Sequence, residues 1–183
     1  MQQNIRLLIL SGLFTSLTAA GAFIKIPFYP VPFTLQNLFT ALAALVLPAR
    51  WAVLSQVAYL MIGLMGLPVF ASGGGIGYVL QPTFGYLLFL PVSAYAIAKG
   101  VSSLSDISLG RLAVVVFLGM LLLLAGGATW LFFHFVYVLD KEVTLTGVLY
   151  SGMLLFLPSA TIKTIVVSLL GRALAKHYQI LIN

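Results

Sequence analysis

Long apolar segments, separated by short polar or Pro- and Gly-rich stretches, fill almost the whole of this chain. Of its 183 residues, 62% are hydrophobic and only 7% are charged, and the mean hydropathy is +1.16. A soluble domain usually carries about 25% charged residues, because its surface faces water. The composition therefore predicts an integral membrane protein that forms a single membrane domain over residues 1–183.

The apolar segments predict an all-α fold, since a helix crosses a bilayer with about 20 apolar residues. We expect six transmembrane helices, at Asn4–Ile24, Leu35–Leu47, Trp51–Gly66, Gln81–Lys99, Arg111–Val138 and Leu145–His177. The second and third look too short to cross alone, and the sixth is expected to kink at Pro158. The apolar part of the first segment is about 18 residues long, more than the ~7–15 of a signal peptide, so it is predicted to be retained as a helix.

Lysine and arginine are distributed unequally between the two ends of the predicted helices. Two of them, Lys25 and Lys141, lie at one end. The other end carries six: Arg6, Arg50, Lys99, Arg111, Arg172 and Lys176. Cytoplasmic ends are enriched in these residues, so both termini are predicted to be cytoplasmic. The Pro-rich loop at 25–33 and the Gly-rich segment at 67–78 would then face outward and cap the bundle.

The residue types that enzymes and metal sites need are scarce. There is no cysteine, and the histidines, His134 and His177, lie at opposite ends of the predicted bundle. The acidic residues Asp106, Asp140 and Glu142 all fall in loops. We therefore expect no metal, no cofactor and no catalytic acid or base, and no buried carboxylate for proton coupling.

Neither nucleotides nor nucleic acids are expected ligands of this chain. The glycines at 73–77 lack the Lys-Ser/Thr pair of a phosphate-binding P-loop and do not open a strand–helix unit. The net charge of +6 comes from basic residues that are too scattered for a nucleic-acid footprint. Active transport would therefore need a partner subunit or an ion gradient.

Lys163 lies deep inside the last apolar segment. Placing an ammonium at bilayer depth costs about 3 kcal/mol on insertion scales. Such a charge therefore usually faces a partner or a cavity. It is too far from the cytoplasmic end of its helix to reach water, and residues 155–163 contain no carboxylate. The sequence therefore predicts contact with an anionic ligand, or with a partner from elsewhere in the fold.

Small residues form a stripe along the first predicted helix. Gly12, Ser16 and Ala20 follow one another at four-residue spacing, with Thr15 and Ala19 beside them. Such a stripe lets another helix approach closely. It favours either packing within this chain or docking onto another membrane subunit, and composition alone does not choose between them.

Four amides lie near the predicted helix ends. We interpret Asn37 and Gln56 as helix caps or as groups hydrated at the interface. Gln36 is a further amide near a helix end, directly before Asn37. Gln81 follows the Gly-rich segment directly, where its amide could face either a cavity or the interface.

Three motifs of the chain resemble those of the BioY family, the biotin-binding S components of energy-coupling factor (ECF) transporters. The first is GAFIKIP at 21–27 with PVPFTLQNLF at 30–39. The second is GGGIGY at 73–78 with PTFGYL at 82–87, and the third is PSATIK at 158–163. The resemblance implies a six-helix S component in a bacterial cell membrane, surrounded by lipid, that binds a vitamin from outside and is not an enzyme. It also implies partners, namely a transmembrane coupling protein and two ATPase subunits. The small residues of the first helix would serve docking onto this module.

The resemblance also implies roles for particular residues. Lys163 would bind the biotin carboxylate. Gln81 and Thr161 are our own candidates for contacts with its head group. The remaining residues expected in the binding site are Phe33, Thr34, Gln36, Tyr78 and Tyr86.

One departure from the family pattern bears on the ligand. Ala160 stands where the family usually has an acidic residue that helps to bind the ureido ring. Alanine cannot accept those hydrogen bonds, and buried ligand groups left unpaired cost affinity. A related acid with an apolar ring, such as lipoate, is therefore an alternative ligand, and a structural membrane protein without a small ligand is an alternative function.

Overall fold

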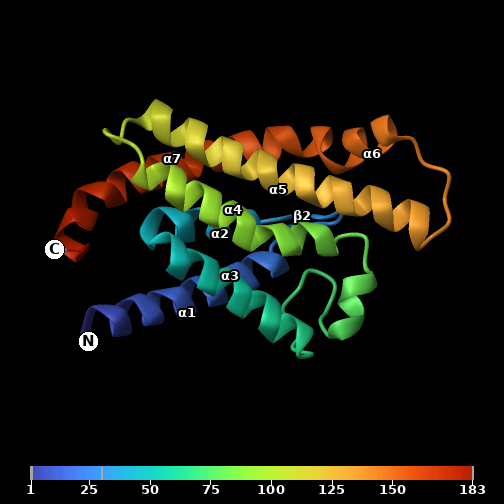
Figure 1. Cartoon of the computed structure of the whole chain (residues 1–183), viewed down its shortest axis with the longest axis horizontal. Coiled ribbons are helices and arrows are strands. Elements are labelled where there is room, and N and C mark those ends of the chain that lie inside the picture. Colours follow the sequence, from blue (N-terminus) through green and yellow to red (C-terminus); the bar gives the residue numbers. More distant parts are fainter. Residues whose placement is uncertain (1, 30, 183) are drawn as a thin grey trace.

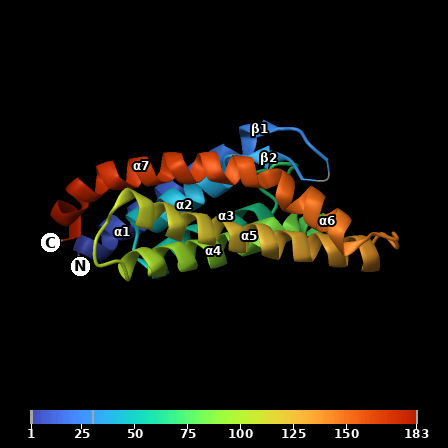
Figure 2. The ribbon, with the colours of Figure 1, turned by 90° about the horizontal axis from the view of Figure 1, so that it is seen from above.

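Helices account for nearly all of the computed structural model, as the apolar segments predicted (Figures 1 and 2). It describes residues 2–29 and 31–182, and side chains as far as residue 173. Pro30 and the side chains of Lys176 and His177, which entered the predictions above, lie outside the described residues. The α-helices are α1 (Gln2–Phe23), α2 (Gln36–Val46), α3 (Ala49–Leu64), α4 (Phe84–Ser102), α5 (Leu109–Tyr137), α6 (Leu145–Gly152) and α7 (Leu157–Ile182).

Four helical segments of the described chain are long and apolar enough to cross a membrane. They are α1, α4, α5 and the segment from α6 into α7, over Leu145–Ala173. The α2 and α3 helices are apolar but have only 11 and 16 residues. At about 1.5 Å per residue, α2 covers roughly half of a hydrocarbon core about 30 Å thick.

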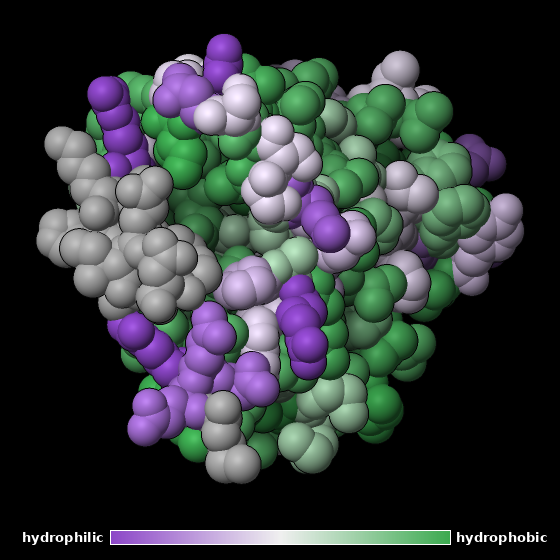
Figure 3. Space-filling model, turned by 60° about the vertical axis from the view of Figure 1, so that its left-hand side comes forward, coloured by the Kyte–Doolittle hydropathy of each residue, from purple (hydrophilic) through white to green (hydrophobic). Residues whose placement is uncertain are grey.

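Successive helices run back and forth along the long axis of the molecule, so the two termini lie at the same end (Figure 1). The α2–α3 turn and the α4–α5 loop lie at this end too, and bring Arg50, Lys99 and Arg111 with them. Figure 3 turns this end toward the viewer, and hydrophilic side chains gather on it between broad apolar surfaces. The helix arrangement therefore separates a basic end from apolar flanks.

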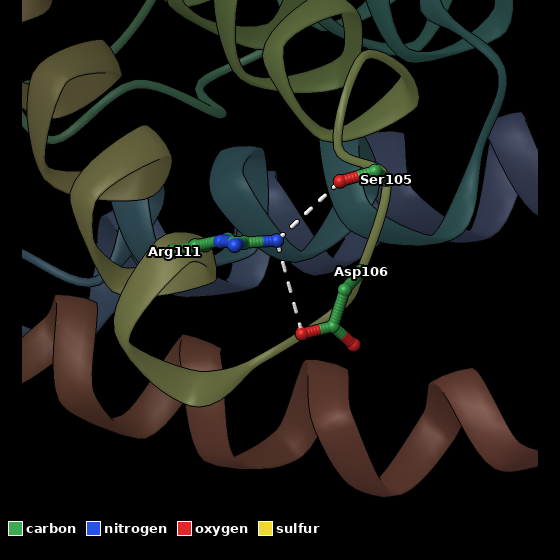
Figure 4. Close-up of polar contacts among 3 residues, drawn as sticks. All are labelled: Ser105, Asp106 and Arg111. Carbon is green, nitrogen blue, oxygen red and sulfur yellow. Dashed lines mark hydrogen bonds and ion pairs between the residues drawn. The ribbon is translucent and has the colours of Figure 1, made fainter.

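The α4–α5 loop contains an ion pair of the described residues. Arg111 Nη1 lies 3.9 Å from Asp106 Oδ2 and donates a hydrogen bond of 3.4 Å to Ser105 Oγ (Figure 4). Both charged side chains are exposed, so water screens the pair and its contribution to stability is small.

The last apolar segment is not one kinked helix, as the sequence suggested, but two helices separated by a break. The α6 helix ends at Gly152, Met153 has non-helical angles, and a short 3₁₀ turn, η2 (Leu154–Phe156), leads into α7. Pro158 is the second residue of α7, where its missing N–H would have no helical acceptor. The predicted kink at Pro158 is therefore wrong, because the proline starts a helix rather than bending one.

The Pro-rich loop is a small hairpin. Strand β1 (Lys25–Ile26) pairs antiparallel with β2 (Phe33–Thr34), with Lys25 opposite Thr34 and Ile26 opposite Phe33. In Figure 2 the hairpin projects beside α2 and α7. Only Leu35 separates the hairpin from α2, so the hairpin fixes where that short helix begins.

Polar side chains join α1, α2 and α3 in the interior. Gln56 is fully buried, accepts a 2.8 Å hydrogen bond from Thr40 Oγ1 on α2, and donates to Ser55 Oγ. Thr15 on α1 donates to the Ser55 carbonyl at 2.9 Å. The interpretation of Gln56 as a cap or a hydrated group is therefore wrong: it links helices within the bundle, where water could not satisfy it.

Candidate functional site

A cavity lies between the hairpin and helices α2, α4, α5 and α7. The cavity and the part of its mouth that is open to solvent together have a volume of about 580 Å³. Its apolar wall contains Val31, Pro32, Phe33, Ala71, Leu87, Leu90, Leu123, Leu124 and Phe156. Its polar side chains are Thr34, Gln36, Asn37, Tyr78, Thr83, Tyr86 and Lys163.

Lys163 reaches this cavity from the second turn of α7 and is only 8% exposed. Its Nζ donates hydrogen bonds to the Thr34 carbonyl at 2.7 Å and to Asn37 Oδ1 at 2.8 Å. Both acceptors are neutral, and the acidic residues of the chain lie in exposed loops, away from the described cavity. The cavity wall therefore carries a positive charge that no described carboxylate compensates, which favours an anionic ligand.

Gln36 forms side-chain hydrogen bonds with Thr34 and Tyr59, beside the backbone that contacts Lys163. Its Oε1 accepts a 2.8 Å hydrogen bond from Thr34 Oγ1, and its Nε2 donates to the Tyr59 hydroxyl at 2.6 Å. Tyr59 in turn donates to the Val69 carbonyl at 3.1 Å. This chain of bonds ties β2 to α2, to α3 and to the segment that follows α3, so the amide of Gln36 is engaged within the protein.

An aromatic wall connects the hairpin with the break between α6 and α7. The rings of Phe33 and Phe156 stack with centroids 4.4 Å apart, and Tyr86 lies beside Phe156 at 6.4 Å. The Tyr86 hydroxyl donates a 2.6 Å hydrogen bond to the Gly152 carbonyl at the end of α6. The side chain thus lines the cavity and satisfies a backbone group that the break leaves without a helical partner.

Two irregular segments close over the cavity. Lys25 Nζ on the hairpin donates to the Ala71 carbonyl of the Gly-rich segment. Gly75 has a φ of +100°, an angle that side chains disfavour, and its N–H donates to the Gly63 carbonyl at 2.7 Å. The glycines therefore permit a tight path that brings Ala71 and Tyr78 to the cavity.

Six of the eight side chains predicted for the site line this cavity: Phe33, Thr34, Gln36, Tyr78, Tyr86 and Lys163. The other two, Gln81 and Thr161, are exposed and lie outside the cavity wall. Gln81 follows the short helix η1 (Ile76–Leu80), and its carbonyl accepts a bond from Trp130 Nε1. Thr161 lies two residues before Lys163, and residues at that spacing point to different helix faces.

Asn37 lines the cavity although the sequence did not predict it as a site residue. It was interpreted as a cap or a hydrated amide, but its side chain contacts Lys163, 126 residues further along the chain. Thr83 and Phe156 were missed as well, although both lie in or near the motifs quoted above. The adjacency of Asn37 to Gln36 was the available signal, whereas its pairing with α7 depends on the tertiary fold.

The small-residue stripe of α1 is divided between two faces. Gly12, Ser16 and Ala20 are exposed, and a side chain at Gly12 would meet no atom of this chain within 4 Å. Ala19 is half-buried, and Thr15 is buried against α3. Three of the five predicted docking residues are therefore available to a partner, and Thr15 serves packing within the chain.

Comparisons with known proteins agree with the motifs. The sequence profile of the BioY family matches residues 1–180. The chain is 43% identical to the "Probable biotin transporter BioY" of Lysinibacillus sphaericus over 131 residues, which are 72% of this chain and 67% of that protein. It is 46% identical to the "Biotin transporter BioY" of Thermotoga maritima over 94 residues, 51% of this chain and a little over half (56%) of that protein.

The fold also matches a solved structure, the crystal structure of the S component for biotin from an ECF-type ABC transporter. The TM-score is 0.80 at 28% sequence identity, and the match covers 96% of this chain and 93% of the other. The likeness therefore extends over nearly the whole bundle, including the elements that surround the cavity.

The hydrogen bond from Tyr86 to the helix break yields a testable prediction. Tyr86→Phe keeps the ring but leaves the buried Gly152 carbonyl without its partner, which should destabilise the protein by about 1–3 kcal/mol. Thermal unfolding in detergent should show a lower midpoint for this variant. Tyr95→Phe is the matched control, because Tyr95 lies exposed on the same helix; equal midpoints for the two variants would contradict the assigned role of Tyr86.

Proposed function

Because this chain belongs to the BioY family, we propose that it is the substrate-binding S component of an ECF-type ABC transporter and that it serves biotin uptake in a bacterial cell membrane. The names of the relatives and the near-complete structural likeness support this function. Its role is binding and delivery rather than catalysis. We also propose that residues 1–183 form a single membrane domain.

The observation that carries the proposal is the buried ammonium of Lys163 at the cavity wall, held only by neutral oxygens among the described residues. Biotin carries a carboxylate on an apolar tail, so its acid would pair with Lys163 and its tail would lie against the apolar wall. Phe33, Tyr78 and Tyr86 would supply aromatic surface to the ligand.

We propose six membrane crossings with both termini in the cytoplasm. The alternating helix directions support this count, with α2 and α3 as short crossings and α6 and α7 together as the sixth. The concentration of Arg and Lys at the end that bears the termini supports the orientation. The hairpin and the Gly-rich segment would then cap the cavity on the outer side, where the vitamin arrives.

Energy for uptake would come from partners, since the chain has no nucleotide-binding motif. We propose a transmembrane coupling protein and two ATPase subunits as these partners. The exposed stripe of Gly12, Ser16 and Ala20 on α1, with Ala19 at its edge, is the surface that we propose for docking. Small side chains there would let a partner helix pack closely.

A related carboxylic acid with an apolar ring, such as lipoate, is a second candidate ligand. The observation that favours it is Ala160, which is buried one turn before Lys163 and offers no acceptor to a ureido ring. Gln81 and Thr161, the head-group contacts expected above, are exposed and lie outside the cavity wall, so they do not replace that acceptor. Hydroxyls of Tyr78 and Thr83 on the cavity wall remain as polar groups for a head group.

Binding by the purified protein, measured by calorimetry in detergent, distinguishes these ligands. We expect biotin to bind with a dissociation constant below about 1 μM, or better than roughly −8 kcal/mol. Lys163→Met should weaken biotin binding by at least about a hundredfold, since it removes a charge-assisted hydrogen bond, while the protein stays folded. Lys99→Met, at an exposed lysine of α4, is the matched control.

Tighter binding of lipoate than of biotin would contradict biotin as the ligand, but it would not contradict the assignment as an S component. Unchanged biotin affinity in Lys163→Met would remove the lysine from the site. No binding of either acid would favour a structural membrane protein instead.

Docking is tested separately from ligand binding. Ser16→Trp should leave biotin affinity unchanged but abolish co-purification with the coupling protein and ATP-dependent uptake, because the bulky ring would hold the partner helix away. Thr129→Trp on α5, an exposed position outside the stripe, should preserve both. Normal complex formation by Ser16→Trp would argue against docking through α1.

A further inference from the structure

The contact between Asn37 and Lys163 joins two segments that are far apart in the sequence. Asn37 is the second residue of α2, and its Oδ1 accepts a 2.8 Å hydrogen bond from Lys163 Nζ on α7. The Thr34 carbonyl, at the end of β2, accepts a second bond at 2.7 Å. The lysine is therefore held from one side, by the short segment that joins the hairpin to α2.

We propose that Asn37 is the positioning residue of the site and sets its preference for a charged ligand, an inference that rests on the proposed function of Lys163. A neutral amide oxygen orients the ammonium without cancelling its charge. A carboxylate at the same place would form an ion pair and would leave the cavity with no net positive charge.

The number of donors supports this role. An ammonium has three N–H donors, and Thr34 and Asn37 accept from two of them. The third donor has no acceptor among the described residues, and Lys163 lines the cavity. It is therefore available to a ligand oxygen, in a wall where it is largely shielded from water.

The amide of Asn37 has a fixed orientation in this arrangement. An ammonium only donates hydrogen bonds, so the oxygen of the amide must face Lys163 and the Nδ2 group must point elsewhere. No described residue accepts a hydrogen bond from Nδ2, and Asn37 itself lines the cavity. Asn37 therefore places two further N–H donors beside the ammonium, where they suit the second oxygen of a carboxylate.

A purely structural role, in which Asn37 only joins α2 to α7, makes a different prediction. A variant that breaks such a contact would lower the affinity for charged and for neutral ligands by the same factor. A positioning role that preserves the charge changes the ratio of the two affinities. The informative measurement is therefore the affinity for biotin relative to biotinamide, which has an uncharged amide in place of the carboxylate.

Asn37→Asp is the decisive variant, because aspartate has nearly the shape of asparagine but pairs with Lys163 and repels an anion. We expect biotin affinity to fall at least about tenfold while biotinamide affinity changes less than about threefold, so that the preference for the acid is lost. Asn4→Asp is the matched control, because it makes the same chemical change at an exposed position in the first turn of α1, away from the cavity. It should leave both affinities unchanged.

The outcomes separate this inference from the proposed function. If the wild-type protein binds biotin no better than biotinamide, the role of Lys163 itself fails. If the wild type prefers biotin and Asn37→Asp keeps that preference, the role of Asn37 is overturned. Should Asn37→Asp unfold, Asn37→Ala serves instead: a loss of biotin affinity with little change for biotinamide supports the role, and an unchanged ratio contradicts it.

Discussion

The need to satisfy one buried ammonium explains much of this architecture. A charge in an apolar helix segment costs several kcal/mol unless it finds partners, and Lys163 finds them in the Thr34 carbonyl and the Asn37 amide. Those groups can reach it only if the hairpin ends, and α2 begins, against α7. The shortness of α2 follows, because its first turn must lie at the depth of the cavity rather than at the membrane surface.

Irregular backbone surrounds the same cavity, and a side-chain hydrogen bond to a backbone carbonyl holds each irregular segment in place. The hairpin and the Gly-rich segment meet at the contact between Lys25 and Ala71. At the break between α6 and α7, Tyr86 donates to the Gly152 carbonyl. In the segment that follows α3, Tyr59, which accepts from Gln36, donates to the Val69 carbonyl. Non-helical backbone at membrane depth persists only when protein or a cavity surrounds it, so these segments and the cavity stabilise one another.

Most of the fold could be predicted from the sequence, because apolar length and Pro or Gly content mark helices and irregular segments directly. The place of Lys163 at a cavity was also predictable, since an intramembrane charge usually faces a partner or a cavity. The break after Gly152 was not, because Pro158 can equally start a helix or bend one, and the bond from Tyr86 to the Gly152 carbonyl joins residues 66 positions apart. The place of Asn37 at the cavity and of Thr161 outside it could not be predicted for one reason: which polar group faces a cavity depends on the helix rotation and on distant partners.

A structure of the protein with biotin bound, determined by crystallography or electron microscopy, tests the central claim most directly. The account predicts that a carboxylate oxygen of biotin lies within about 3 Å of Lys163 Nζ, a normal hydrogen-bond distance, while Thr34 and Asn37 keep their contacts with the lysine. A ligand bound outside this cavity, or one whose carboxylate points away from Lys163, would contradict it.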